Sequence, residues 1–278
     1  MDVVVVISDD NYQQYARTLI KTIGVFNSLN VVHVQIKDNL TEQDSFVISN
    51  GSKFTCIRIP QLGKTAEGKR VYSAICRFDM AKNLLLSNPE IETLIYIDAD
   101  SIVRGPLDPL IELFKRENRT VGLRVRENHQ HPYLSGILFF AQQSRPLLDE
   151  LTTEMIRADL TWGQDQSILA KVLSKNQSYS VLNFESTLVG WDLHKTLLIW
   201  SAKGPSRREA DAFIFESWSM PYLSRLPRNL NKGFRLTIFA LSSLLDKARF
   251  RQHFHSLRSQ ILVLIKNFTS LIKKTDGN

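Results

Sequence analysis

Cysteine is scarce in this sequence. Only two of its 278 residues are cysteine, Cys56 and Cys76, and neither belongs to a Cys-x-x-Cys pair or a Cys/His cluster. A disulfide framework or a zinc site is therefore not indicated. Long hydrophobic runs are also lacking, since a stretch such as residues 236–245 is too short and too rich in serine to cross a bilayer. Residues 1–7 have no basic region of the kind that begins a secretion signal. We therefore expect a cytoplasmic protein.

Acidic residues are nearly absent from the C-terminal part. Residues 225–278 contain eleven Lys or Arg and two Asp, a net charge of +9, so the total of +7 leaves −2 for everything before them. Apolar residues there recur at spacings of three and four beside basic ones, which predicts a basic amphipathic helix or helix pair. We expect residues 231–278 to form a tail appended to a domain of residues 1–230.

Two interpretations of the tail remain open. Its charges beside an apolar face suit an anionic membrane surface, which would place the protein peripherally on the inner face of the membrane. Alternatively, the tail packs on the domain with a solvated basic face. Nucleic acid is not an expected partner, because an RNA-reading motif and interleaved exposed aromatics are lacking.

Strand-like apolar runs alternate with helix-like stretches before the tail. The predicted strands are residues 3–7, 31–36, 54–59, 93–97, 120–125 and 136–140. The predicted helices are residues 12–23, 73–86, 145–158 and 166–174, with a loop at 63–70. This alternation indicates the α/β class, with a mainly parallel sheet covered by helices.

Two aspartates directly follow the predicted strand 93–97. Asp98, Ala99 and Asp100 form an Asp-x-Asp sequence, which is weak alone because sixteen aspartates would give about one such match by chance. The position strengthens it, since open α/β sheets bind ligands at the carboxyl ends of their strands. Two carboxylates there suit a Mg²⁺- or Mn²⁺-like cation that also binds phosphate. The alternative is a pair of turn or capping aspartates.

A polar stretch also ends the first predicted strand. It contains Ser8, Asp9, Asn11 and Tyr12. There a carboxylate can accept a hydrogen bond from uracil, an amide can bind a ribose hydroxyl, and a tyrosine ring can stack on the base. The alternative is an Asx turn that caps the following helix.

Two further positions could contribute to a site. Arg77 lies among apolar residues of the predicted helix 73–86, where a guanidinium either pairs with a buried acid or reaches a diphosphate. Asp165 and Gln166 stand at the start of a helix, where they either act as a cap or surround the hydroxyls and anomeric carbon of a sugar.

These segments, taken in this order, resemble glycosyltransferase family 8, and most closely its bacterial lipopolysaccharide galactosyltransferases. The resemblance covers roughly residues 1–205. It implies a GT-A fold with a Rossmann-like sheet, a UDP-sugar donor, manganese, and transfer with retention of anomeric configuration. It also implies a cell-surface glycan or glycolipid acceptor, as in polysaccharide biosynthesis.

The resemblance also assigns roles to residues. It places Asp9, Asn11 and Tyr12 at the uridine, Arg77 at the donor, and Asp98 and Asp100 at the metal, with Ala99 between them. Ser8, which precedes Asp9, is expected among the donor-binding residues. Asp165 and Gln166 fall at the donor sugar and the active centre, and the strand from Tyr133 to Leu138 resembles one that lines the sugar site, with Leu134 replacing its asparagine.

One departure from the family pattern concerns the metal. Ile199 stands where the family has a metal-binding histidine, and His194 is offset from that position. Asp98, Asp100 and the diphosphate would remain as ligands, so metal binding should weaken without being abolished. Arg77 and Lys203 are expected to assist departure of UDP. The alternative is a catalytically weak UDP-sugar-binding protein with the same fold.

Overall fold

The computed structural model describes most of the first 201 residues. The described residues are 1–9, 11–37, 44–48, 52–58, 66–127, 129, 131–158, 163–191 and 196–201. The tail at residues 231–278 lies outside them, as do His194 and Lys203. The proposed boundary between a domain and a tail therefore stays a prediction.

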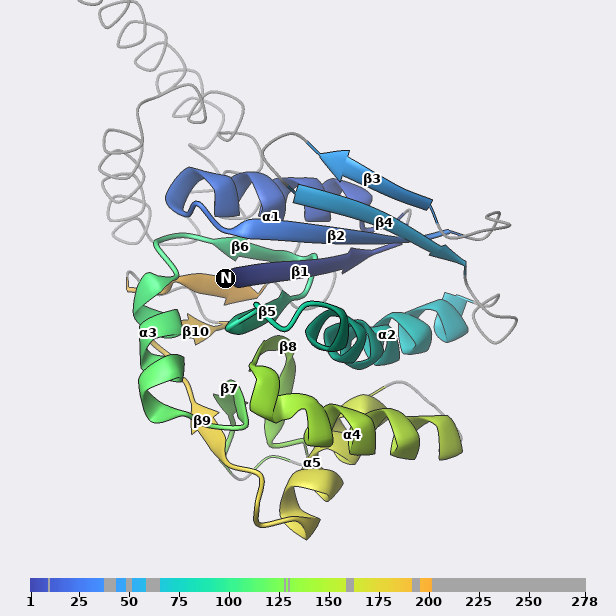
Figure 1. The fold of residues 1–278 in the computed structure, drawn as a ribbon, viewed down its shortest axis with the longest axis vertical. Coiled ribbons are helices and arrows are strands. Elements are labelled where there is room, and N and C mark those ends of the chain that lie inside the picture. The colour runs from blue at the N-terminus through green and yellow to red at the C-terminus, as the bar shows by residue number, and fades with distance from the viewer. Residues whose placement is uncertain are drawn as a thin grey trace, which may run out of the picture.

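An eight-stranded, mostly parallel sheet forms the centre of the molecule (Figure 1). Its strand order is β3-β4-β2-β1-β5-β8-β7-β9. The bounds are β1 Asp2–Ser8, β2 Asn30–Lys37, β3 Asp44–Ile48, β4 Ser52–Arg58, β5 Thr93–Ile97, β7 Val121–Val125, β8 Tyr133–Phe140 and β9 Val181–Asn183. A second, three-stranded sheet consists of β10 Val189–Gly190, β11 Ile199–Ser201 and β6 Ser101–Val103. The predicted α/β class with a mainly parallel sheet is confirmed.

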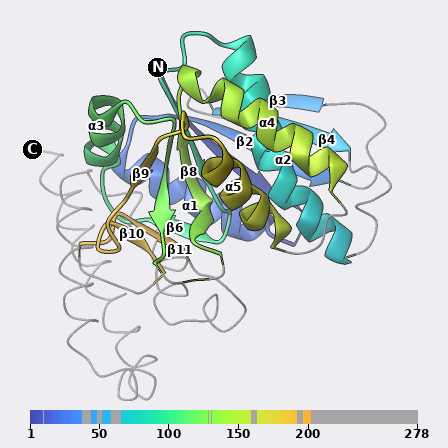
Figure 2. The ribbon, with the colours of Figure 1, turned by 90° about the horizontal axis from the view of Figure 1, so that it is seen from below.

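Helices cover both faces of the large sheet. They are α1 Gln13–Phe26, α2 Ala66–Ser87, α3 Asp108–Glu117, α4 Arg145–Arg157 and α5 Gln164–Lys175, with a 3₁₀ turn at Gln142–Ser144. α2, α4 and α5 pack on one face, and α1 and α3 on the other (Figure 2). Several predicted bounds were wrong. α2 already begins at Ala66 inside the expected loop, α5 begins two residues before Gln166, α1 extends to Phe26, and β8 begins at Tyr133.

Alternate residues of β1 enter the two cores. Val3 and Val5 pack with α2, whereas Val4 and Val6 pack with α1. A central strand covered on both faces reads as a continuous run of β-branched residues, as residues 3–7 do. No helix among the described ranges is long and apolar enough to cross a membrane.

The strand order indicates at which ends of the strands a ligand would bind. From β1 the chain continues to β2 and β4 on one side, and β5 then pairs with β1 on the other side. Such a reversal is the topological switch point at which open α/β sheets bind ligands, beyond the carboxyl ends of the strands. Here that point lies between the ends of β1 and β5.

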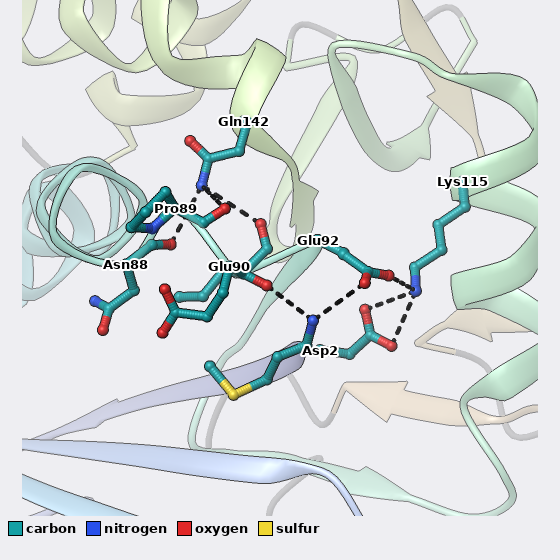
Figure 3. Close-up of polar contacts among 9 residues, drawn as sticks. Asp2, Asn88, Pro89, Glu90, Glu92, Lys115 and Gln142 are labelled. Carbon is teal, nitrogen blue, oxygen red and sulfur yellow. Dashed lines mark hydrogen bonds and ion pairs between the residues drawn. The ribbon is translucent and has the colours of Figure 1, made fainter.

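Polar contacts link segments near the amino-terminal ends of β1 and β5 (Figure 3). Lys115 of α3 contacts Asp2 Oδ1 at 3.1 Å and Glu92 Oε2 at 2.7 Å. Gln142 Nε2 donates to backbone carbonyls that follow α2, among them that of Asn88 at 3.3 Å. These contacts join the start of β1, the approach to β5 and two helices away from the switch point.

Candidate functional site

Arg77 lies at the centre of a buried polar network at the carboxyl end of β5. Its Nη1 donates to the carbonyl oxygen of Ser135 on β8 and lies 3.4 Å from Asp98 Oδ1. Its guanidinium carbon lies 4.9 Å from the centre of the Tyr96 ring. Burial alone would lower its pKa, but the surrounding acidic groups raise it on balance: Tyr96, Asp98, Asp165 and Asp100. Arg77 is therefore a fixed positive charge, and both alternatives foreseen for it, acid pairing and anion contact, stay compatible with its position.

The two aspartates follow β5 in a tight turn. The Asp98 backbone N–H donates to the Gly136 carbonyl oxygen at 2.7 Å, and the Tyr96 hydroxyl donates to Asp98 Oδ1 at 2.7 Å. Burial raises the pKa of Tyr96 well above its ordinary value, so this hydroxyl keeps the proton it donates. Asp100 is 8% exposed. Two carboxylates thus lie at the switch point where the sequence placed them.

Asp165 belongs to the same network although it is distant in sequence. It lies buried in the first turn of α5, where the positive end of the helix dipole stabilises a negative charge. The hydroxyl of Ser135 donates to Asp165 Oδ2 at 2.7 Å, and Arg77 donates to the carbonyl oxygen of Ser135. Ser135 therefore links Arg77 and strand β8 to the helix that carries Asp165 and Gln166.

In the turn after β1, Asp9 forms a contact within the turn, while its assignment to a uridine stays a prediction. Asp9 Oδ1 accepts a hydrogen bond at 2.9 Å from the backbone N–H of Tyr12, three residues later, so Asp9 ties the turn to the start of α1. Asn11 is exposed and Tyr12 half-buried, with its ring 5.8 Å from that of Tyr15. Ser8 is buried and its hydroxyl lies 2.8 Å from His33 Nε2. Asn11 and Tyr12 thus keep exposed side-chain surface after the end of β1, whereas the Ser8 hydroxyl contacts the buried His33.

The donor set fits a hard divalent cation only together with a phosphate-bearing ligand. Among the residues that the structure describes, no group of three or more His, Cys, Asp or Glu side chains could hold a metal ion. Ile199 is fully buried in β11, opposite Val103 of β6, and packs in the apolar core with α1. Mg²⁺ sites of one or two carboxylates completed by substrate phosphates are common, and Asp98 and Asp100 match that pattern.

A pocket opens beside the network. It is a hollow open to solvent, and the space in and over it amounts to about 340 Å³. Its walls come from β7, β8, α5 and the small sheet: Arg124, Leu134, Ser135, Gly136, Ile137, Gln166, Val189, Gly190, Trp191 and Ser201.

Sequence reasoning missed three features of this region. Tyr96 holds Asp98, and its place two residues earlier on the same strand face could have indicated this. The wall residues Arg124 and Trp191 have no local pattern that marks them. They reach the pocket through the pairing of β7 with β8 and through the small sheet, which are long-range contacts.

A comparison with protein-family models finds no match for this sequence, and a comparison with curated proteins finds none either. Solved structures do match. The glycosyltransferase GlyE of Streptococcus pneumoniae TIGR4 has a TM-score of 0.54 at 15% identity, over 85% of this chain and 63% of GlyE. The chain thus spans less than two thirds of GlyE.

Two other matching structures are covered almost completely. The galactosyltransferase LgtC, solved with donor and acceptor sugar analogues, has a TM-score of 0.54 at 14% identity, over 81% of this chain and 97% of LgtC. A glycosyltransferase involved in glycosylation of the major capsid of PBCV-1 has a TM-score of 0.52 at 11% identity, over 80% of this chain and 99% of the other. The fold is the GT-A type of these glycosyltransferases.

Proposed function

We propose that this protein is a retaining GT-A glycosyltransferase that moves a hexose from a UDP-sugar to a cell-surface glycan or glycolipid. One observation carries the proposal. Arg77, Asp98, Asp100 and Asp165 come from three separate segments and converge at the switch point of a fold shared with solved glycosyltransferases. Fold alone does not determine activity, so the argument depends on this network.

The turn after β1 is the proposed uridine site. Tyr12 offers a half-exposed ring on which a base can stack, and Asn11 offers an exposed amide for a ribose hydroxyl. Asp9 already accepts one backbone hydrogen bond and is half-buried, which holds the turn in shape. Ser8 supports the turn from within through His33.

The diphosphate is proposed to lie between Arg77 and the aspartate pair. Asp98 and Asp100 would hold Mn²⁺ or Mg²⁺, which when bound supplies positive charge to the departing UDP. Arg77 adds a permanent positive charge and has a buried Nε–H with no partner in the described structure. Donors fixed before the reaction stabilise developing charge without reorganisation, so we assign most of the rate enhancement to this arrangement.

The sugar is proposed to enter the pocket. Gln166 lines it directly, and Ser135 holds the Asp165 carboxylate in place beside it. These groups can orient the sugar hydroxyls and the anomeric carbon while the acceptor hydroxyl attacks from the face that UDP leaves.

The assignment is tested by Asp98→Asn and Asp100→Asn, which keep side-chain size but remove charge. Asp108→Asn, an exposed aspartate at the start of α3, is the matched control. With UDP-hexoses and Mn²⁺, we expect each site variant to lower UDP release by about 100-fold or more, as loss of one preorganised stabilising group does. The control should match the wild type. Unchanged turnover in both site variants would contradict the assignment.

A catalytically weak UDP-sugar-binding protein is the second candidate, and Ile199 in the apolar core favours it. Calorimetric titration of UDP with and without Mn²⁺, followed by the release assay, separates the two. Metal-enhanced UDP binding without turnover on any UDP- or GDP-hexose would support the binding protein.

A further inference from the structure

The charge among the described side chains that line the pocket beside Gln166 is positive. Among the described residues that line it, Arg124 is the only charged one, and none is acidic. The polar network around Arg77 differs, because there Asp98, Asp100 and Asp165 surround the guanidinium.

Arg124 reaches the pocket from the end of β7. It lies opposite Leu134 of β8, just after the register between the two strands shifts, an irregularity of the kind that re-aims side chains. Its Nη1 donates to the Phe184 carbonyl oxygen at 3.2 Å. Among the described residues it forms no ion pair with a carboxylate.

A second arginine lies against the pocket wall. The guanidinium carbon of Arg126 is 4.7 Å from the centre of the Trp191 ring, and Trp191 lines the pocket. Arg126 Nη2 donates to the His131 carbonyl oxygen at 2.6 Å, while its Nε is buried with no partner in the described structure. Burial lowers the pKa of Arg126.

Two partly buried guanidinium groups that form no ion pair with a carboxylate of the described residues attract an anion. The arrangement is not needed for packing alone, because an apolar or amide side chain could fill the same space. The proposed function makes the pocket a sugar site, and a guanidinium can bind the planar carboxylate of a uronic acid or the phosphate of a sugar phosphate through two hydrogen bonds.

We propose, resting on the proposed function, that the sugar unit bound in this pocket carries an anionic group, a carboxylate or a phosphate, that pairs with Arg124 and Arg126. The anionic sugar has two sources. It is either the donor sugar of a UDP-uronic acid or the unit of an acidic acceptor glycan.

Two arms of a binding experiment on the full chain distinguish these sources. The donor arm compares UDP-glucose with UDP-glucuronic acid, and UDP-galactose with UDP-galacturonic acid, by calorimetry with Mn²⁺. The acceptor arm compares methyl glucoside with methyl glucuronide and with glucose 6-phosphate, in the presence of UDP. The members of each pair differ mainly in the anionic group.

We expect the anionic member to bind at least about tenfold more tightly in one arm, as hydrogen bonds to charged groups allow. Arg124→Gln and Arg126→Gln should each remove most of that preference, and Arg124→Lys should keep part of it because the charge remains. Arg116→Gln, on an exposed arginine of α3, is the control and should keep the whole preference.

Equal affinity for neutral and anionic members in both arms would overturn the inference, as would an undiminished preference in both glutamine variants. UDP alone is titrated first. If UDP does not bind, the proposed function is contradicted. In that case the anionic and neutral glycosides are compared without UDP, and this comparison still tests the inference. Thermal unfolding of each variant checks that it is folded.

Discussion

His33 shows how a residue outside the reaction can matter to the site. It lies buried in β2, and its Nε2 contacts the hydroxyl of Ser8 at the end of β1. Burial, together with the positive charge of Arg17, lowers its pKa from 6.5 to about 4. The folded protein therefore keeps His33 neutral at pH values where the unfolded chain would protonate it.

This difference predicts a pH dependence of stability. Between pH 6.5 and 4 the unfolded state binds a proton that the folded state refuses, so stability falls as the pH falls through that window. The contribution of His33 is a loss of about 2 kcal/mol between pH 7 and pH 5, obtained from the two pKa values. We expect His33→Gln to remove that part of the difference in urea unfolding free energy, while His129→Gln, at an exposed histidine, keeps it. An identical pH difference in His33→Gln and the wild type would refute the prediction.

Secondary-structure elements were predictable where a pattern was long enough to show. Strand β5 has the predicted bounds, and α2 ends at Ser87, just before the Asn88–Pro89 stop. Strands β6, β10 and β11 were missed because two or three residues show no period. Helix α3 was also missed, although Asp108 followed by proline is a helix-start signal that could have revealed it.

Strand β7 depends on a glycine that sequence patterns did not explain. A Cβ at Gly122 would lie 2.9 Å from Phe184 Cζ, 3.0 Å from Phe114 Cδ2 and 3.0 Å from Phe139 Cβ. All three phenylalanines are fully or almost fully buried. The absence of a side chain at residue 122 therefore lets β7 pack closely against this aromatic cluster.

We expect Gly122→Ala to destabilise the protein by about 1 to 3 kcal/mol, the usual cost of overpacking a well-packed core. Gly24→Ala is the matched control, because nothing lies within 4 Å of the added Cβ in α1. Alanine there should be neutral or stabilise by about 0.5 to 1 kcal/mol, since glycine is unfavourable inside a helix. Urea unfolding measures both. Equal unfolding free energies of the Gly122 variant and the wild type would show that the aromatic side chains move to accommodate the added Cβ without a loss of stability.

At the scale of the whole molecule, the sequence predicted which residues would form the candidate site but not the contacts between them. Asp98, Arg77 and Asp165 were found from local context and family order, and the fold brings them into one network. Their mutual distances could not be predicted, because they depend on how α2 and α5 pack against β8. The link through Ser135, the place of Arg124 in the pocket wall and the contact of Arg126 with Trp191 arise only from long-range packing.

The distribution of charge along the chain predicts a membrane interaction. Residues 225–278 carry +9 and the rest of the chain −2, and the basic residues of the tail accompany a helical apolar pattern. Such a segment binds anionic lipid through its apolar area together with about 1 kcal/mol for each basic residue at the surface. A glycosyltransferase that acts on a glycolipid would thereby be held where its acceptor lies.

We expect the full chain to float with liposomes that contain anionic lipid and not with phosphatidylcholine alone, and added salt should weaken the binding. Replacing Lys266, Lys273 and Lys274 by Gln leaves the apolar pattern intact and should weaken binding by about 100-fold, because three charges contribute about 3 kcal/mol. A chain that ends at residue 233 should lose the binding. If the shortened chain binds as well as the full one, the membrane contact belongs elsewhere, and the tail is better explained as a helix packed on the domain with its basic face in solvent.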